Sequence, residues 1–157
     1  MSRFLTPLRI EDTGVAHNGR PIFRILESFD YEIGAEGSGL IIQVPIGFET
    51  DFASVPKFLW FVLPPWGIHG KAAVLHDFLY RRASGFGKDV ADAIFYEAMT
   101  VLGVTWWRRY LMYLGVAYLG RSAYNWKEPM AAEAEVRMLD GERVKDEFRK
   151  SPKNGTA

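Results

Sequence analysis

The sequence predicts an α+β fold, with a small N-terminal antiparallel β-sheet or hairpins followed by a helical half that holds an antiparallel helix pair and a long buried aromatic helix. Short runs of β-branched and aromatic residues, separated by turn formers, occupy the first fifty positions, and apolar patterns of helical spacing follow from position 71. With 157 residues, 48% of them apolar, the chain is long enough for one packed core. We expect a single domain over residues 1–126, mainly β at 3–50 and mainly α at 56–126. Residues 127–157 should form a charged C-terminal helical segment and a flexible tail.

Three strands are expected in the first half, at residues 21–26, 29–33 and 40–44. Asn18-Gly19 stands before the first of them, and three glycines separate the last two. Glycine and asparagine tolerate the positive φ angles that tight hairpin turns require. The pattern therefore predicts antiparallel strands joined by short turns.

The segment 45–65 joins the two halves and places polar residues in an apolar context. Ser54, followed by Pro56, is typical of a helix N-cap with proline in the first turn, which predicts a short helix over 56–63. Asp51 comes just before this cap. It is either another turn or capping carboxylate, or a carboxylate directed from the loop toward the next helix.

Residues 71–82, KAAVLHDFLYRR, predict the central helix. Because a helix turns about 100° per residue, His76 and Tyr80 share one face and Asp77 lies one step round. The rest of the segment is largely apolar. A polar group buried without a partner is costly, so these three side chains need hydrogen-bond partners, a metal ion or a water-filled cleft.

A second helix is expected over residues 90–102, where apolar residues recur at helical spacing. The short glycine-containing linker before it favours antiparallel packing of the two helices. Asp92 lies at the edge of the apolar stripe near the start of this helix. It should therefore come close to His76 and Tyr80, near the end of the central helix.

A third helix is expected over residues 105–126, which are apolar nearly all round and include three tryptophans. We predict a buried core helix in which Gly115 and Gly120 allow a neighbour to approach closely. The uncharged run 110–120 is far shorter than the roughly 20 residues that cross a bilayer. No transmembrane segment is therefore expected.

The overall composition excludes several classes of protein. With 19 basic and 19 acidic residues the formal net charge is zero, so we expect no nucleic-acid partner. The absence of cysteine rules out disulfides and thiolate metal sites. The first residues carry charges where a secretory signal needs a continuous apolar core, so no signal peptide is expected. The balanced charges after position 127 are typical of a solvated face, although a partner could dock there.

His76 and Asp92 are the candidate catalytic pair, with Tyr80 beside them. A histidine base needs a carboxylate or carbonyl on its other ring nitrogen, and Asp92 is the best-placed candidate. The structural alternative is a core histidine satisfied by a backbone carbonyl, with Asp92 completing a capping box from Asp89. These residues alone favour the two interpretations about evenly. The sequence contains neither a nucleophilic serine elbow nor a phosphate-binding loop.

Asp77 and Asp51 are the candidate metal ligands, because carboxylate and loop carbonyl oxygens are what calcium prefers. Zinc is disfavoured. The chain has three histidines, and His69 lies seven residues from His76, roughly 10 Å along a helix, too far to share one ion. The structural alternative for Asp77 is a surface salt bridge with Arg81, four positions on.

Three segments resemble a known family: VPIGFETDFASVP, AAVLHDFLYRR, and DVADAIFYEAM with the LGV that follows it. Over roughly residues 29–126 the chain resembles a phage and prophage family known as domain of unknown function 1353. The positions that match are Gly47, Thr50, Asp51, Ser54, Pro56, His76, Asp77, Tyr80 and Asp92. The family has no assigned reaction. The resemblance implies a phage protein, located in the host cytoplasm after phage expression or assembled in the virion, with phage structural proteins as partners.

A shorter stretch, HDFLYRR followed by ADAIFYEAM, is similar to the His-Asp helix pair of secreted phospholipases A-two. That resemblance implies that His76 activates a water, that Asp77 holds calcium and that Asp92 orients His76, with Tyr80 in support. The chain lacks the cysteines of that family and its glycine-rich calcium loop before the helix. Asp51 would have to replace part of that loop.

Two functional hypotheses follow. The first is a calcium-assisted hydrolase of phage origin, in which His76 is the general base. A lipid ester is the leading substrate, and peptide or cell-wall bonds of the cell envelope are left open. The second is a non-enzymatic virion or accessory protein whose His-Asp cluster is a buried network that fixes helix packing.

Overall fold

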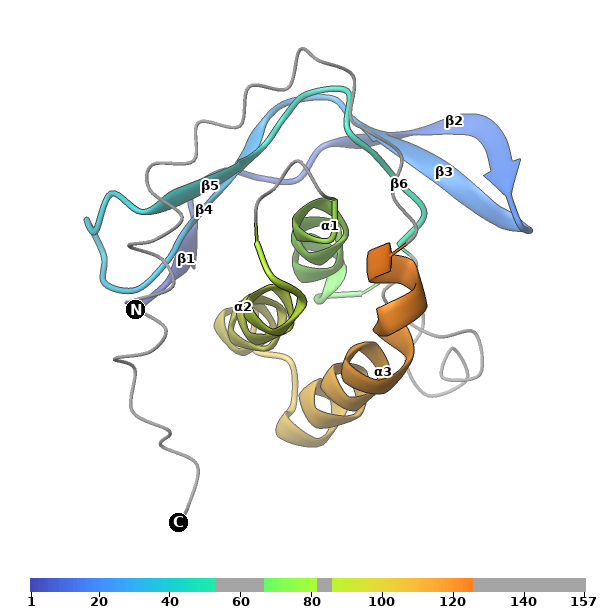
Figure 1. Cartoon of the computed structure of the whole chain (residues 1–157). Helices are drawn as coiled ribbons and strands as arrows, with labels where there is room; N and C mark the ends of the chain where they lie inside the picture. Colours follow the sequence, from blue (N-terminus) through green and yellow to red (C-terminus); the bar gives the residue numbers. More distant parts are fainter. Residues whose placement is uncertain (53–66, 82–85, 126–157) are drawn as a thin grey trace.

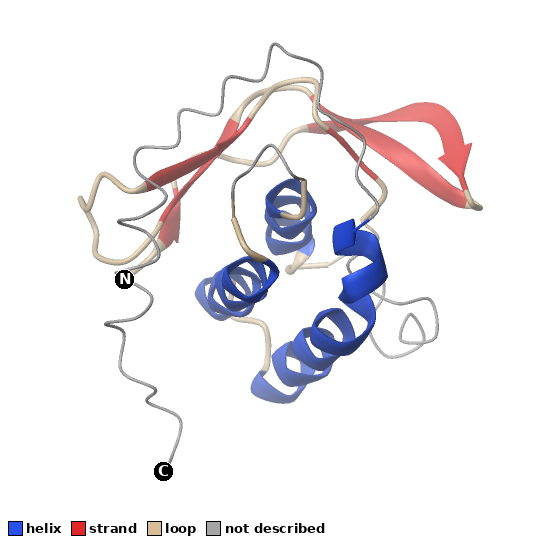
Figure 2. Cartoon of the chain, viewed as in Figure 1, coloured by secondary structure: helices blue, strands red, loops and turns tan. Residues whose placement is uncertain are grey.

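The computed structural model describes residues 1–52, 67–81 and 86–125, and for 121–125 it describes the backbone alone. Within these ranges the strands come first and the helices follow, which confirms the predicted α+β class (Figure 2). The strands form two small antiparallel sheets, in the orders β1-β4-β5 and β2-β3-β6. The helices form a separate layer beneath them (Figure 1).

The first sheet is made of β1 (Arg3–Phe4), β4 (Phe29–Glu32) and β5 (Ile41–Val44). Its two longer strands pair antiparallel, with Phe29 opposite Val44 and Tyr31 opposite Ile42. These four side chains are buried. Alternate residues of a strand point to one face, so this pairing turns one apolar face toward the helices.

The second sheet is made of β2 (Ile10–His17), β3 (Arg20–Ile25) and β6 (Glu49–Thr50). Asn18 and Gly19 turn the β2–β3 hairpin with φ angles of 51° and 72°. The predicted hairpin position is therefore confirmed, because both central residues of such a turn need positive φ. The predicted strands 21–26, 29–33 and 40–44 correspond to β3, β4 and β5 within a residue or so at each end.

The helices are α1 (Gly70–Leu79), α2 (Lys88–Val101) and α3 (Trp106–Asn125). They correspond to the predicted segments 71–82, 90–102 and 105–126. Tyr80 is the C-cap residue of α1 rather than part of its body. Gly103, with a φ angle of 74°, turns the chain between α2 and α3, a conformation that glycine adopts at little cost.

Helix α1 lies between the strands and the other helices (Figure 1). On the sheet side, the ring of Phe78 meets Phe48, with centroids 5.5 Å apart and the rings nearly perpendicular. On the other side α1 packs against α2, which in turn packs against α3. Seven of the ten residues of α1 are buried, as expected of a helix in the middle of the core.

The expectation of a buried aromatic helix is not met by α3. Its inner side is buried at Met112, Val116 and Gly120, whereas Trp106 is 71% exposed and Tyr118 is 79% exposed. Both sides of α3 are apolar, but only the inner side packs against α2. Burial on most sides belongs instead to α1, which has the strands on one side and α2 on the other.

Several predictions fall outside the described residues. These are the Ser54 cap with the short helix 56–63, and the charged C-terminal segment 127–157. Among the described helices, none is long and apolar enough to cross a membrane.

Candidate functional site

The predicted contact between the first two helices is present. Asp92 of α2 lies with its Oδ1 atom 2.8 Å from Nε2 of His76 in the last turn of α1. The Tyr80 hydroxyl, which follows α1, donates to the same oxygen at 2.6 Å. The three predicted catalytic residues therefore form one cluster where the end of α1 meets the start of α2.

Lys88 is a fourth member of the cluster that sequence reasoning missed. Its Nζ donates to Asp92 Oδ2 at 2.6 Å and to the Ala117 carbonyl oxygen at 3.2 Å. The signal was available, since Lys88 stands four residues before Asp92, a spacing that brings side chains together on a helix. The helix expected from the sequence begins at residue 90, which leaves Lys88 in the linker before it.

Helix α2 does not use Asp92 as a cap. It begins at Lys88, with Gly87 at the N-cap position and no side-chain hydrogen bond to the helix end. A capping box from Asp89 to Asp92 is therefore wrong, because the helix starts before Asp89. The Asp92 carboxylate is directed to other side chains.

The cluster is buried, and the pKa values of two of its members are shifted from their ordinary values. The side chains of His76 and Asp92 are 1% and 4% exposed, and Lys88 is 15% exposed. Burial raises the pKa of Asp92, but the hydrogen bonds from His76, Lys88 and Tyr80 more than compensate and leave that pKa below its usual value. The pKa of Tyr80 is raised, first by burial and then by its hydrogen bond to Asp92.

Rings hold the histidine in place. The His76 imidazole lies with its centroid 4.0 Å from the Tyr80 ring and 4.6 Å from the Phe95 ring. The Tyr80 ring in turn lies against Gly120 of α3, where an added Cβ would come within 2.5 Å of the Tyr80 hydroxyl. The predicted role of Gly120 in close approach is therefore confirmed.

The predicted metal ligands have other partners. Asp77 Oδ2 accepts a hydrogen bond from the Thr50 hydroxyl at 2.5 Å, and Thr50 Oγ1 also accepts from the Phe52 backbone N–H at 3.1 Å. Asp51 Oδ2 lies 3.7 Å from Nη1 of Arg20. Within the described ranges, no group of three histidine, aspartate or glutamate side chains is arranged to hold a metal ion.

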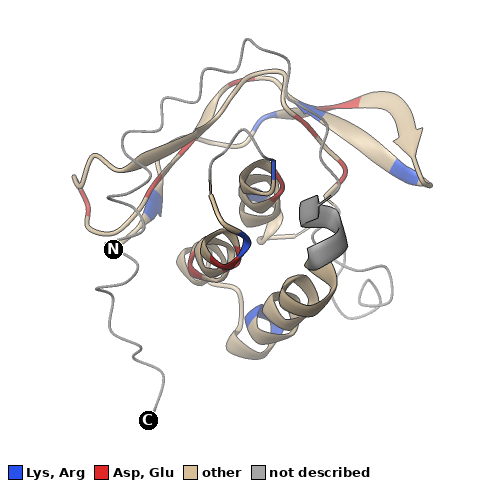
Figure 3. Cartoon of the chain, in the orientation of Figure 1, with Lys and Arg blue, Asp and Glu red and all other residues tan. Residues whose placement is uncertain are grey.

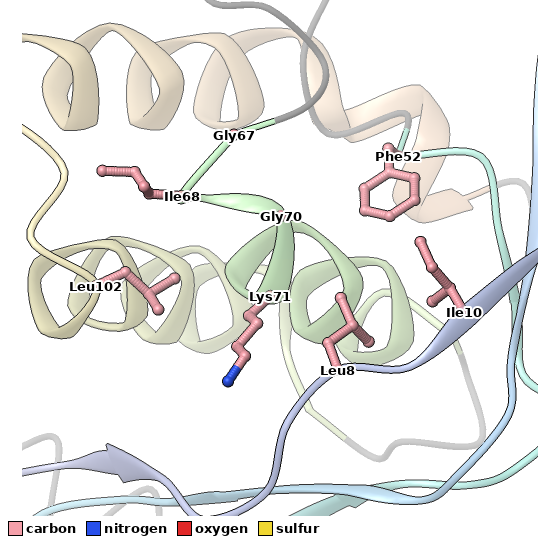
Figure 4. Close-up of a pocket in the computed structure, with 8 residues that line it drawn as sticks. All are labelled: Leu8, Ile10, Phe52, Gly67, Ile68, Gly70, Lys71 and Leu102. Atoms are coloured by element: carbon pink, nitrogen blue, oxygen red, sulfur yellow. The ribbon is translucent and has the colours of Figure 1, made fainter.

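An apolar pocket of about 430 Å³ opens beside the first turn of α1 (Figure 4). It is lined by side chains from the start of β2 and the residues before it, the loop after β6, the start of α1 and the residues before it, and the end of α2, namely Leu8, Ile10, Phe52, Ile68, Lys71 and Leu102. Phe52 links it to the Thr50–Asp77 pair through the backbone hydrogen bond described above. The loop that carries Asp51 thus forms part of the wall of the pocket, through Phe52.

Comparison with known families supports the first resemblance. Residues 23–116, more than half of the chain, match the family described as a protein of unknown function (DUF1353). The chain belongs to the DUF1353 family. The match runs from the middle of β3 through β4 to β6, α1 and α2 into the first half of α3, and so includes His76, Tyr80, Lys88 and Asp92.

One relative of this DUF1353 protein is an uncharacterized protein, y4jT, from Sinorhizobium fredii (strain NBRC 101917 / NGR234). The two are 33% identical over 103 residues, which are 64% of this chain and 30% of the relative. The chain therefore spans about 30% of the length of this relative. No solved structure matches the chain.

Proposed function

We propose that this DUF1353 protein is a hydrolase in which His76 is a general base toward water and a lipid-type ester is the substrate. The observation that carries the proposal is the hydrogen bond between Asp92 and His76 Nε2. The lowered pKa of Asp92 means that its carboxyl is ionised near neutral pH. An ionised carboxylate only accepts hydrogen bonds, so Nε2 of His76 carries the proton in this pair, and Nδ1 is the nitrogen that we propose as the base.

In the proposed reaction the cluster carries out a proton transfer. His76 Nδ1 would take a proton as the oxygen of water bonds to the ester carbonyl carbon. Asp92 stabilises the imidazolium that forms, and the proton passes to the alcohol oxygen as the ester bond breaks. Tyr80 and Lys88 are positioning residues, because they contact Asp92 and fix its carboxylate on Nε2.

The substrate class rests on two supports. The residues HDFLYRR and ADAIFYEAM resemble the helix pair of a phospholipase family. The apolar pocket at the first turn of α1, the opposite end of the helix from His76, has room for part of an acyl chain. Association with phage is a prediction that rests on the family resemblance.

Calcium also stays a prediction. Asp77 accepts a hydrogen bond from Thr50, and Asp51 lies near Arg20. A calcium ion held by both carboxylates would therefore have to compete with Thr50 and Arg20. The test is direct: calcium binding by Asp77 and Asp51 should raise the melting temperature of the wild type but not of Asp77→Asn. No step of the proposed proton transfer depends on the ion.

The test of the hydrolase is release of fatty acid from phosphatidylcholine vesicles. We expect activity from the wild type and a loss of at least about 100-fold in His76→Ala, the usual contribution of a general base. The matched control is His17→Ala, which changes an exposed histidine in β2. Circular dichroism at the assay temperature shows whether each variant is folded. A folded His76→Ala protein with full activity would disprove the proposal.

The low exposure of the cluster favours a second candidate, a non-enzymatic protein in which these residues fix the packing of the helices. His76 is 1% exposed, and both oxygens of Asp92 accept hydrogen bonds. Both candidates predict that His76→Ala lowers the free energy of unfolding by about 1–3 kcal/mol, the usual cost of losing a buried polar partner. Hydrolysis by the wild type therefore separates the two, since the packing role predicts none.

A further inference from the structure

The outer side of α3 exposes large apolar and aromatic side chains. Trp106, Tyr110, Tyr118 and Leu119 are each more than half exposed, at 71%, 53%, 79% and 52%. Single exposed apolar residues are ordinary on protein surfaces, whereas a continuous group of them marks an interaction site. The question is whether these residues form one surface.

Helical spacing places Trp106, Tyr110 and Tyr118 on one side of α3, and Leu119 apart from them. Trp107, Leu111, Leu114 and Tyr118 follow one another at steps of four, three and four residues, which puts them on one face. Trp106 and Tyr110 flank this stripe. The opposite face carries Met112 and Val116, which are buried. We call the stripe, with its two flanking residues, the outer face of α3. Helix α3 itself lies beyond α1 from the strands over most of its length (Figure 1).

The charge of this helix has one sign. From Gly103 to Gly120 the sequence contains Arg108 and Arg109 and no acidic residue. Arg108 is exposed, and its guanidinium lies 5.1 Å from the centroid of the Trp107 ring. The part of α3 whose side chains are described shows basic and no acidic colour (Figure 3). The Arg109 guanidinium lies instead over the Tyr96 ring of α2, 5.4 Å from its centroid. Arg108 therefore gives the outer face a positively charged edge, to which an anionic partner is complementary.

We propose that the outer face of α3 binds the surface of an anionic lipid bilayer, with the helix lying in the plane of the interface. Tryptophan and tyrosine have an apolar body and a polar tip, which suits the boundary between headgroups and acyl chains. Arginine beside such rings attracts anionic headgroups. A second copy of the chain fits less well, because the face would have to meet another face that is also basic.

This proposal goes beyond the hydrolase and does not depend on it. The experiment uses vesicles of ether-linked lipids, which contain no ester to hydrolyse, so binding is measured apart from any reaction. Full-length protein is sedimented with vesicles of ether-linked phosphatidylcholine alone and with about 30% ether-linked phosphatidylglycerol. Tryptophan fluorescence is recorded in parallel, since burial of Trp106 and Trp107 in the interface should shift emission to shorter wavelength.

We expect strong binding to the anionic vesicles and weak binding to the neutral ones. Trp106→Ser combined with Tyr118→Ser should lower the partition coefficient at least tenfold, and Arg108→Glu should lower binding to anionic vesicles. The matched control is Val15→Ser with Ile46→Ser, which changes two exposed apolar residues in the strand half, 57% and 68% exposed. It should bind like the wild type.

Three results would overturn the proposal. One is a wild type that fails to bind anionic vesicles. Another is a folded Trp106→Ser, Tyr118→Ser variant that binds as well as the wild type. The third is a wild-type dimer in analytical ultracentrifugation that this variant dissociates, without any vesicle binding by either protein. That last result would assign the outer face of α3 to a second copy of the chain.

Discussion

Asp92 accepts hydrogen bonds from three side chains, His76 and Tyr80 at the end of α1 and Lys88 at the start of its own helix. Burying a carboxylate is costly unless donors replace the water that it loses. Here the donors more than compensate, since the pKa of Asp92 is lowered in spite of its burial. His76 Nε2 is therefore bonded to a carboxylate that two other donors also hold.

Removing the Tyr80 hydroxyl tests whether its hydrogen bond helps to hold Asp92. Tyr80→Phe keeps the ring against His76 but removes the donor to Asp92. We expect the free energy of unfolding to fall by roughly 1.5–3 kcal/mol, as for a hydrogen bond to a charged group. Urea unfolding measures this, with Tyr118→Phe, at an exposed tyrosine of α3, as the matched control. Equal stability of Tyr80→Phe and wild type would mean that the hydroxyl does not hold Asp92.

Thr50 makes a second prediction at the residue scale. Its buried hydroxyl donates to Asp77 and accepts from the Phe52 backbone N–H, so it ties the end of β6 to α1. Thr50→Val keeps the shape and removes both hydrogen bonds, and we expect a loss of about 1–2 kcal/mol in the free energy of unfolding. Thr50→Ser keeps the hydroxyl and should lose less. If the two variants were equally stable, the hydroxyl would have no structural role.

The contact between α3 and the end of α1 depends on Gly120. An alanine Cβ there would lie 2.5 Å from the Tyr80 hydroxyl, which Asp92 holds in place. We expect Gly120→Ala to cost about 1–3 kcal/mol, as overpacking usually does. Gly87→Ala is the control, because a Cβ at Gly87 meets nothing within 4 Å and its φ angle is −70°.

A double-mutant cycle separates this contact from a general effect on the helix. Tyr80→Phe removes the closest atom, so Gly120→Ala should cost less in that background, with a coupling of roughly 1 kcal/mol. Strictly additive losses in thermal or urea unfolding would show that the Tyr80 hydroxyl does not limit the approach of α3.

The elements that the sequence predicted well are those whose pattern is local. Apolar spacing located α1 and α2, and the Asn18-Gly19 pair located the hairpin, because both signals lie within a few neighbouring residues. Strand β2 was not among the predicted strands, since IEDTGVAH has few apolar residues and is mostly exposed. The burial of α3 was mispredicted because hydropathy shows that a side chain is apolar but not whether a second layer covers it.

The candidate site shows the same limit. Helical spacing and the short linker were enough to predict that Asp92 lies close to His76 and Tyr80. The partners of Asp77 and Asp51 could not be predicted, because Thr50 and Arg20 reach them from strands far away in the sequence. The Thr50–Asp77 contact depends on how the sheet packs on α1, and the Arg20–Asp51 contact depends on how β3 pairs with β6, neither of which a local pattern describes.

At the scale of the whole molecule, one carboxylate connects the helical layer. Asp92 joins α2 to the end of α1, and Lys88 extends the connection to α3 through the Ala117 carbonyl oxygen. The strands attach to the same layer through the Thr50–Asp77 hydrogen bond and the Phe48–Phe78 ring contact. A change in the charge of Asp92 should therefore affect global unfolding rather than one helix.

Acid unfolding tests this at the scale of the whole chain. The pKa of Asp92 is lower in the folded protein than its ordinary value of 3.8. Its stabilisation is therefore fully present above the unfolded-state pKa and is lost as the pH falls through the lower folded-state pKa. Asp92→Asn leaves Lys88 without its ion-pair partner, so we expect a loss of about 3 kcal/mol at pH 7, the lower part of the range for breaking a buried pair.

The difference between wild type and Asp92→Asn should shrink as the pH falls below 3.8, because a protonated Asp92 no longer differs from asparagine in charge. Urea unfolding at a series of pH values from 7 downward measures this difference directly. Asp89→Asn, an exposed carboxylate one helical turn away on α2, is the control and should stay close to wild type. A difference between wild type and Asp92→Asn that does not change with pH would mean that charge is not what Asp92 contributes to the fold.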